Sequence, residues 1–260
     1  MAAYALADKA ALPVGAAAGL FGSMVGVGGG VLIVPALTAC GTQVLQKVVS
    51  GTSLVAVIAT SAASTAEYVK TGQVDVPAAG IIASAAVLSA PLGARATSVL
   101  SQAALKRCLG VFLCGAAPLV PLKHHLFKGN AGDAREQRRL DAPRIALLGT
   151  SGAVAGFASG LLGIGGGTLV SPMLALSGEY TQVQAVATSL AAMFVPSCVA
   201  LATHARLGNV RWPMGVSLAV GAAFGAAGGA RFAVQAPPGT LESVFGCGMG
   251  ALGAKTLLRG

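Results

Sequence analysis

Charged side chains are scarce in this chain of 260 residues. Lys, Arg, Asp and Glu together make up 10% of the sequence, against about 25% in an ordinary soluble domain. Apolar residues make up 55%, and the mean hydropathy is +0.77. The shortage of charge excludes an ordinary soluble enzyme, and the apolar excess excludes a disordered chain. These numbers predict a membrane protein with several spans, each about 20 residues long to cross about 30 Å of hydrocarbon.

Motifs for catalysis and metal binding are also missing. The five cysteines are scattered and form no CxxC pair, and the sequence contains neither HExxH nor GxSxG. We therefore expect no disulfide framework, no metal site, no cofactor and no enzyme activity. Basic residues outnumber acidic ones by 17 to 8, but no nucleic-acid-binding motif accompanies them. We expect no nucleic-acid partner and interpret the basic residues as flanks of membrane spans.

The most informative feature present is an internal repeat. Residues 15–37 and 152–174 are identical at 11 of 23 positions when aligned at an offset of 137. After a slip of one residue the similarity continues at an offset of 136, with Thr-Ser-Leu from Thr52 and Thr188 and Gly-Ala-Arg ending at Arg95 and Arg231. Composition alone would not produce ordered matches over about 80 positions, so the chain is a duplicated unit. Repeats of this kind are common in secondary transporters, whose binding sites lie where the halves meet.

Each unit contains four apolar segments, which we expect to form an all-α bundle of about eight transmembrane segments. We place the segments at 13–37, 48–66, 77–94, 108–122, 145–176, 185–203, 213–230 and 244–257. The predicted organisation is a first repeat over 1–122, a basic cytoplasmic loop over 123–144 and a second repeat over 145–260.

The distribution of Lys and Arg predicts an orientation. If every segment crosses once and the loop is cytoplasmic, 12 basic residues lie inside and 5 outside. If the first segment of each half is re-entrant, so that the halves are inverted, the counts become 8 and 9. Basic residues accumulate on the cytoplasmic side. The count therefore favours eight crossings with both termini in the cytoplasm, and we expect the plasma (cell inner) membrane.

Three adjacent glycines interrupt the first segment of each half. They are Gly28, Gly29 and Gly30 in the first half and Gly165, Gly166 and Gly167 in the second. Glycine weakens a helix by about 1 kcal/mol relative to alanine, and helices break at membrane depth where they are buried or line a cavity. We predict broken or re-entrant first helices whose freed N–H groups face an anion; the alternative is a simple kink between packed helices. Other glycines spaced four apart, such as Gly152, Gly156 and Gly160, predict close helix packing.

Polar residues near these glycines are the remaining site candidates. Thr52, Ser53, Thr188 and Ser189 recur in both halves, and their hydroxyls can cap a helix, bond across helices or contact a substrate. Arg95 and Arg231 either reach the lipid headgroups or attract an anion to a cavity mouth. Glu67 and His204 are the candidates for proton coupling, with a carboxylate at the membrane edge as the alternative for Glu67.

The repeated motifs resemble those of the sulfite exporter TauE/SafE family. The resemblance rests on residues 26–37, on Thr52-Ser53-Leu54 and on residues 72–77, together with their second copies from Gly163, Thr188 and Gly208. It covers residues 13–257 in the correct order. The resemblance implies a permease with duplicated halves that moves small sulfur-containing or carboxylated anions, such as sulfite, sulfoacetate or related organosulfonates. Two features depart from the pattern: the strongly basic loop, and an aromatic residue, Trp212, in the second half only.

Together these observations predict a transporter that binds a small anion between its halves and works by alternating access. Its expected partners are the anion and the lipid bilayer, and the sequence leaves open proton or sodium coupling and assembly into a homo-oligomer. A passive anion channel and a membrane scaffold without transport are the alternatives.

Overall fold

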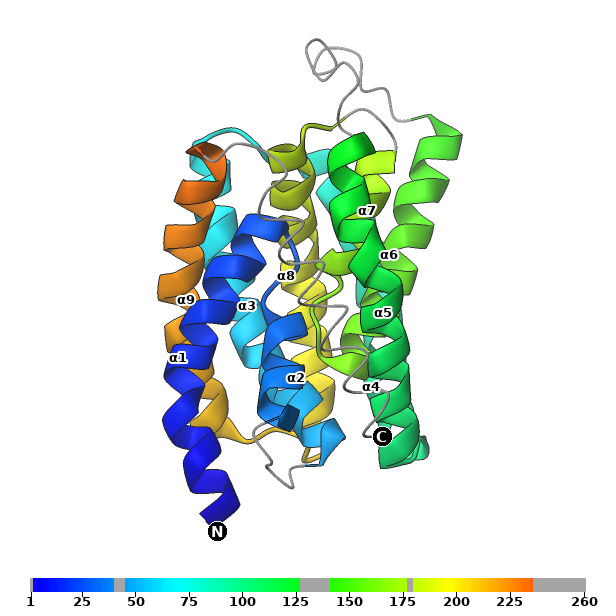
Figure 1. The fold of residues 1–260 in the computed structure, drawn as a ribbon. Coiled ribbons are helices and arrows are strands. Elements are labelled where there is room, and N and C mark those ends of the chain that lie inside the picture. The colour runs from blue at the N-terminus through cyan, green and yellow to red at the C-terminus, as the bar shows by residue number, and fades with distance from the viewer. Residues whose placement is uncertain (1, 40–44, 127–140, 177–179, 236–260) are drawn as a thin grey trace.

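The computed structural model describes residues 2–39, 45–126, 141–176 and 180–235. Nine helices are formed within these residues (Figure 1). They are α1 (Ala2–Val25), α2 (Gly30–Ala39), α3 (Gln46–Lys70), α4 (Val76–Val99), α5 (Gln102–Leu126), α6 (Ala142–Leu162), α7 (Gly167–Leu176), α8 (Gln182–Arg206) and α9 (Trp212–Gln235). The predicted all-α class is confirmed for the described part of the chain. The predicted eighth segment, 244–257, lies outside the described residues.

Five of these helices are long and apolar enough to cross a membrane. They are α3, α4, α6, α8 and α9, with 21 to 25 residues each and a hydropathy of 1.3 to 1.9 over their best windows. About 20 residues of helix are needed to span the hydrocarbon layer. The chain is therefore an integral membrane protein.

The first segment of each half is a broken helix, as predicted. α1 ends at Val25 and α2 begins at Gly30, while α6 ends at Leu162 and α7 begins at Gly167. The interruptions, called here the first break (residues 26–29) and the second break (residues 163–166), contain glycines with positive φ, among them Gly29 (75°) and Gly166 (52°). Residues with a Cβ rarely adopt this backbone conformation, which explains why glycine stands there in both halves.

Each broken helix returns to the face from which it entered. In Figure 1, α1 rises from the N-terminus and α2 runs back down, whereas α6 descends and α7 runs back up. Contacts support this for the second half, because Arg144 at the start of α6 donates to the hydroxyl of Tyr180, just before α8. Tyr180 in turn bonds Asp75, which follows α3. The start of α8 thus lies beside the end of α3, and the two helices enter the membrane from opposite faces.

This arrangement corrects the predicted orientation. Eight single crossings would place the N-terminus and the loop 123–144 on one face, but α1 begins at one end of the bundle and α5 ends at the other (Figure 1). The arrangement matches the re-entrant alternative, for which the charge counts of 8 and 9 show no bias. The count therefore no longer supports both termini in the cytoplasm. Residues 127–140 of the loop lie outside the described part.

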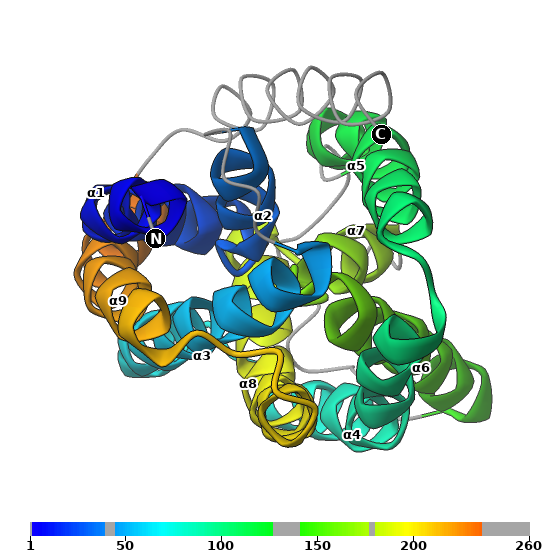
Figure 2. The same ribbon diagram turned by 90° about the horizontal axis from the view of Figure 1, so that it is seen from below.

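Close helix packing through glycine is confirmed in both halves. A Cβ on Gly152, Gly156 or Gly160 of α6 would lie 2.5 Å or less from backbone oxygens of α4, and Gly15 and Gly19 of α1 meet α9 in the same way. Small residues spaced four apart let two backbones approach along one face. Figure 2 shows the α1–α9 and α4–α6 pairs on two sides, with α3 and α8 between them.

Candidate functional site

The two breaks lie against each other in the interior, backbone to backbone. A Cβ on Gly30 would lie 2.5 Å from the carbonyl oxygen of Gly163, and a Cβ on Gly167 would collide with the carbonyl oxygen of Gly26. Gly30 and Gly167 are also the first residues of α2 and α7. Two helix N-termini, each carrying about half a positive charge from the aligned peptide dipoles, therefore approach each other where the halves meet.

Several backbone amides at these N-termini donate no hydrogen bond to any described residue. The amides of Leu32 and Ile33 donate to Gly29 O, and those of Leu169 and Val170 donate to Gly166 O. By contrast, four amides have no partner in the part of the chain that the structure describes: those of Gly29, Val31, Gly166 and Thr168. These four form two equivalent pairs at the repeat offset of 137. They are the freed N–H groups that the glycine triplets predict.

The predicted serines of the Thr-Ser-Leu motif tie each half to the break of the other. Ser53 Oγ lies 2.7 Å from Gly163 O, and Ser189 Oγ lies 3.4 Å from Gly26 O. Each hydroxyl also lies within hydrogen-bond distance of a carbonyl in its own helix. Both serines are fully buried. In this conformation they act as bonds between the halves.

The predicted threonines make a second pair of bonds between the halves. Thr52 Oγ1 accepts from the amide of Arg211 at 3.0 Å, and Thr188 Oγ1 accepts from the amide of Asp75 at 3.0 Å. Arg211 precedes α9 and Asp75 precedes α4, so each threonine holds the connection between two helices of the opposite half. Contact of these hydroxyls with a substrate stays a prediction.

A set of buried hydroxyls that the sequence analysis missed has no partner among the described residues. Thr60, Ser61 and Ser197 are fully buried and unpaired, as are Ser50, Ser64 and Ser159. Ser61 and Ser197 occupy equivalent positions at the offset of 136 that also pairs the Thr-Ser-Leu motifs. Ser61 follows the Thr-Ser-Leu motif by about two helical turns, so following the repeat alignment along this helix would have found the pair.

The predicted ionisable residues lie away from the breaks or are bonded to backbone. Glu67 forms two hydrogen bonds with Arg231, at 3.1 and 3.2 Å, and one with Lys70. Arg95 is exposed on α4, and its side chain has no partner in the described part of the chain. His204 is fully buried, with Nε2 2.7 Å from Gly160 O and Nδ1 unpaired. Since Gly160 O only accepts, Nε2 carries the proton here.

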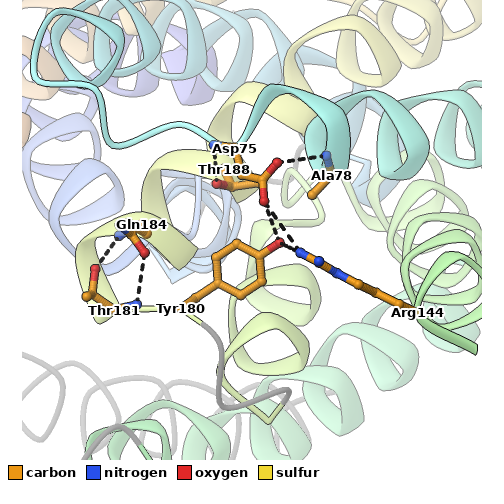
Figure 3. Close-up of polar contacts among 7 residues, drawn as sticks. All are labelled: Asp75, Ala78, Arg144, Tyr180, Thr181, Gln184 and Thr188. Atoms are coloured by element: carbon orange, nitrogen blue, oxygen red, sulfur yellow. Dashed lines mark hydrogen bonds and ion pairs between the residues drawn. The ribbon is translucent and has the colours of Figure 1, made fainter. Parts of the chain in front are cut away.

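At the end where α3 leaves the bundle, one charged cluster joins the halves (Figure 3). Tyr180 donates to Asp75 Oδ2 at 2.8 Å and accepts from Arg144 at 2.7 Å, while Arg144 lies 3.5 Å from the same carboxylate oxygen. Asp75 also accepts from the amide of Ala78 and so caps α4. Burial, and then the adjacent Asp75 carboxylate, raise the pKa of Tyr180 to about 12.

The described part of the interior contains no buried carboxylate. The buried polar residues that the structure describes are Ser, Thr, Gln, Asn and His. Asp75 and Glu67 keep 11% and 18% of their side chains exposed. At the breaks the N-termini of α2 and α7 present the positive ends of their dipoles, beside the carbonyl ends of α1 and α6, where Ser53 and Ser189 lie within hydrogen-bond distance of Gly163 O and Gly26 O. Among the described residues no three His, Cys, Asp or Glu side chains gather in a metal-binding group.

Known proteins are similar to this chain over most of its length. The family model for the sulfite exporter TauE/SafE matches residues 11–256. The chain belongs to the TauE/SafE family. This TauE/SafE chain is 30% identical to the probable membrane transporter protein YunE of Bacillus subtilis, over 81% of the chain and 83% of the relative. It is 29% identical to a probable membrane transporter protein of Methanocaldococcus jannaschii, over 94% and 93%. No solved structure matches it.

The TauE/SafE family is a family of membrane transporters, so this chain belongs to a membrane transporter family. The breaks, both Thr-Ser-Leu motifs and the charged cluster all lie within the matched residues. The position of the glycine breaks between the halves agrees with the general location of binding sites in transporters built from repeats.

Proposed function

We propose that this TauE/SafE protein is a permease, not an enzyme, that moves a small anion such as sulfite, sulfoacetate or a related organosulfonate. The observation that carries the proposal is the meeting of two broken helices, whose N-termini face the same buried region without a carboxylate. Helix N-termini bind anions because their first amides are free and the dipole is positive there. The names of the family and of its relatives agree with transport.

A dehydrated anion would need few direct contacts at this place. Hydrogen bonds to a charged group contribute about 1.5–3 kcal/mol each. The free amides of Gly29, Val31, Gly166 and Thr168 supply four donors, and neighbouring hydroxyls supply others. Thr52, Ser53, Thr188 and Ser189 would join the site when the bonds between the halves rearrange. Arg95 and Arg231 lie near the ends of their helices, where they would attract anions from solution.

The proposed mechanism is alternating access by two inverted halves of four segments each. The bonds from Ser53 and Ser189 to the opposite breaks would open as one half rocks against the other. We keep the proposal that the protein lies in the plasma membrane with both termini in the cytoplasm. This requires the eighth segment to cross the membrane. The basic loop 123–144 would then lie on the outer face, because the N-terminal end of α1 and the C-terminal end of α5 lie at opposite ends of the bundle.

Uptake into proteoliposomes tests the proposal. The purified chain would be offered sulfite, thiosulfate, sulfoacetate and small carboxylates, with and without imposed proton or sodium gradients. We expect saturable, gradient-driven accumulation of at least one sulfur oxyanion. Flux that does not saturate and cannot drive accumulation would indicate a passive channel, and no flux of any anion would indicate a scaffold.

The gradients also identify the coupling ion. If protons drive transport, replacing Glu67 by Gln and His204 by Gln separates the two candidates. His204 is buried and bonds Gly160 O, three residues before the second break, whereas Glu67 is held by Arg231 and Lys70. We therefore expect the loss of coupling in the His204 variant.

A further inference from the structure

We propose that Thr60, Ser61 and Ser197 form the hydroxyl part of the anion site, where they bind the oxygen atoms of a sulfite or sulfonate group. This inference rests on the proposed transport of a small anion and assigns residues to it. The three side chains are fully buried and have no hydrogen-bond partner in the part of the chain that the structure describes. A buried hydroxyl without a partner costs about 1–3 kcal/mol, so a ligand that pairs all three would recover that free energy.

Thr60 lies directly at the first break. Its Oγ1 would be 3.3 Å from a Cβ placed on Gly29, which makes the hydroxyl a neighbour of the free Gly29 amide. The break therefore presents a backbone donor and a side-chain donor next to each other. A methyl group on Gly29 would intrude on this space, and its φ of 75° also favours glycine.

Ser61 lies one helical turn beyond a residue that packs between the two breaks. Val57 contacts both Gly28 and Gly165, with its Cγ1 at 3.6 and 2.7 Å from the Cβ positions of these glycines. Residues four apart lie on the same face of a helix. Ser61 therefore faces the same side of α3 as Val57, toward the region between the breaks.

Ser197 repeats this placement in the second half. Met193, four residues earlier on α8, packs with its thioether against Gly166. Val57 and Met193 occupy equivalent positions of the repeat, and both pack against glycines of the breaks. Ser61 and Ser197 therefore lie on the faces of α3 and α8 that approach the breaks.

The donor set selects the chemical class of the ligand. All the groups are neutral donors: three hydroxyls and the amides of the breaks. An anion with three oxygen atoms on one sulfur can accept from donors on both sides, whereas a carboxylate presents two oxygens on one side. We therefore expect tighter binding of sulfite and sulfoacetate than of acetate.

Removing these hydroxyls should weaken binding without weakening the fold. Ser61→Ala, Ser197→Ala and Thr60→Val delete an unpaired hydroxyl at nearly constant shape, so the thermal midpoint without anion should be unchanged or raised. Each should raise the KM for sulfite uptake by about tenfold or more, because a hydrogen bond to a charged ligand is lost. The rise in thermal midpoint on adding sulfite should fall in parallel.

Ser53→Ala is the matched control on the same helix. Its hydroxyl is already bonded to Gly163 O at 2.7 Å, so its loss should lower the thermal midpoint without anion. Ser84→Ala removes an exposed hydroxyl bonded within α4, and this variant should behave as wild type in both measurements.

The outcomes separate this inference from the proposed function. Wild-type flux of sulfite with unchanged KM and unchanged thermal stabilisation in the three variants would overturn the inference and leave transport standing. A lower midpoint in the three variants, as in Ser53→Ala, would show a structural role and also overturn it. Absence of anion flux in the wild type would overturn the proposed function together with this site.

Discussion

The first and second halves make equivalent contacts, some with the same side chain and some with different ones. Ser53 bonds Gly163 O as Ser189 bonds Gly26 O, and both partners are glycines at the start of a break. Tyr68 donates to Ser23 O, and at the equivalent position His204 bonds Gly160 O. In each of these contacts the partner of the side chain is a backbone carbonyl. The serine bonds join the two halves, whereas the Tyr68 and His204 bonds lie within one half.

The differences gather along one face of α3 and at one end of the bundle. α3 carries Thr60 and Ser64 where α8 carries Pro196 and Ala200. Asp75 stands where the second half has Arg211, and only the acid joins the described cluster with Arg144 and Tyr180. The two halves therefore share a frame but differ in the polar side chains at these positions.

The largest effect should come from filling the contact between the breaks. Gly30→Ala and Gly167→Ala each place a Cβ against the backbone of the opposite break, and overpacking of this kind costs about 1–3 kcal/mol or more. Because the contacts are equivalent, we expect equal losses of thermal midpoint and of folded yield on gel filtration. Gly80→Ala, where a Cβ meets nothing within 4 Å, is the control. A stable, wild-type-like product from either break variant would contradict the equivalence.

An intermediate effect should distinguish the two serines. Ser53→Ala leaves the buried Gly163 carbonyl without a partner, which costs about 1–3 kcal/mol. Ser189→Ala should cost less, because its bond to Gly26 O is 3.4 Å long against 2.7 Å and longer bonds are weaker. Thermal unfolding in detergent measures both. Equal losses would show that the two bonds contribute equally, and a larger loss for Ser189→Ala would reverse the expected order; either result would contradict the prediction.

The smallest effect concerns Tyr180, which has a valine, Val44, at the equivalent position in the first half. Its pKa is raised to about 12, above the ordinary value of about 10. Above pH 10 the unfolded chain loses this proton and the folded chain keeps it, so the stability present below pH 10 falls as pH rises toward 12. Thermal midpoints of wild type and Tyr180→Phe between pH 8 and about 11.5 should diverge accordingly. Parallel curves would exclude the raised pKa.

The helix breaks could be predicted from the sequence, but the direction in which the chain runs after each break could not. The glycine triplets at Gly28 and Gly165 predict breaks because glycine acts on the backbone where it stands. The return of α7 to its own face depends instead on contacts such as Arg144 with Tyr180, which are 36 residues apart. The count of Lys and Arg contains no information about such contacts, and the single crossings that it favoured were wrong.

The site was predictable in its backbone part only. The free amides follow from the glycine breaks. The partners of Thr52 and Ser53 lie 159 and 110 residues away, so no local pattern shows that these hydroxyls are already bonded. Ser61 and Ser197 were overlooked because they stand in apolar surroundings without a motif, although the repeat itself aligns them.

The exchange of hydrogen bonds across the breaks has a consequence for how such a protein can originate. The carbonyls of Gly26 and Gly163 each receive a hydroxyl from the opposite half, so one half alone would leave its break unpaired in the interior. Only a copy inserted upside down supplies the missing serine. A single-unit ancestor would have had to insert in both orientations and pair with itself, and gene fusion would then have made that antiparallel partnership permanent.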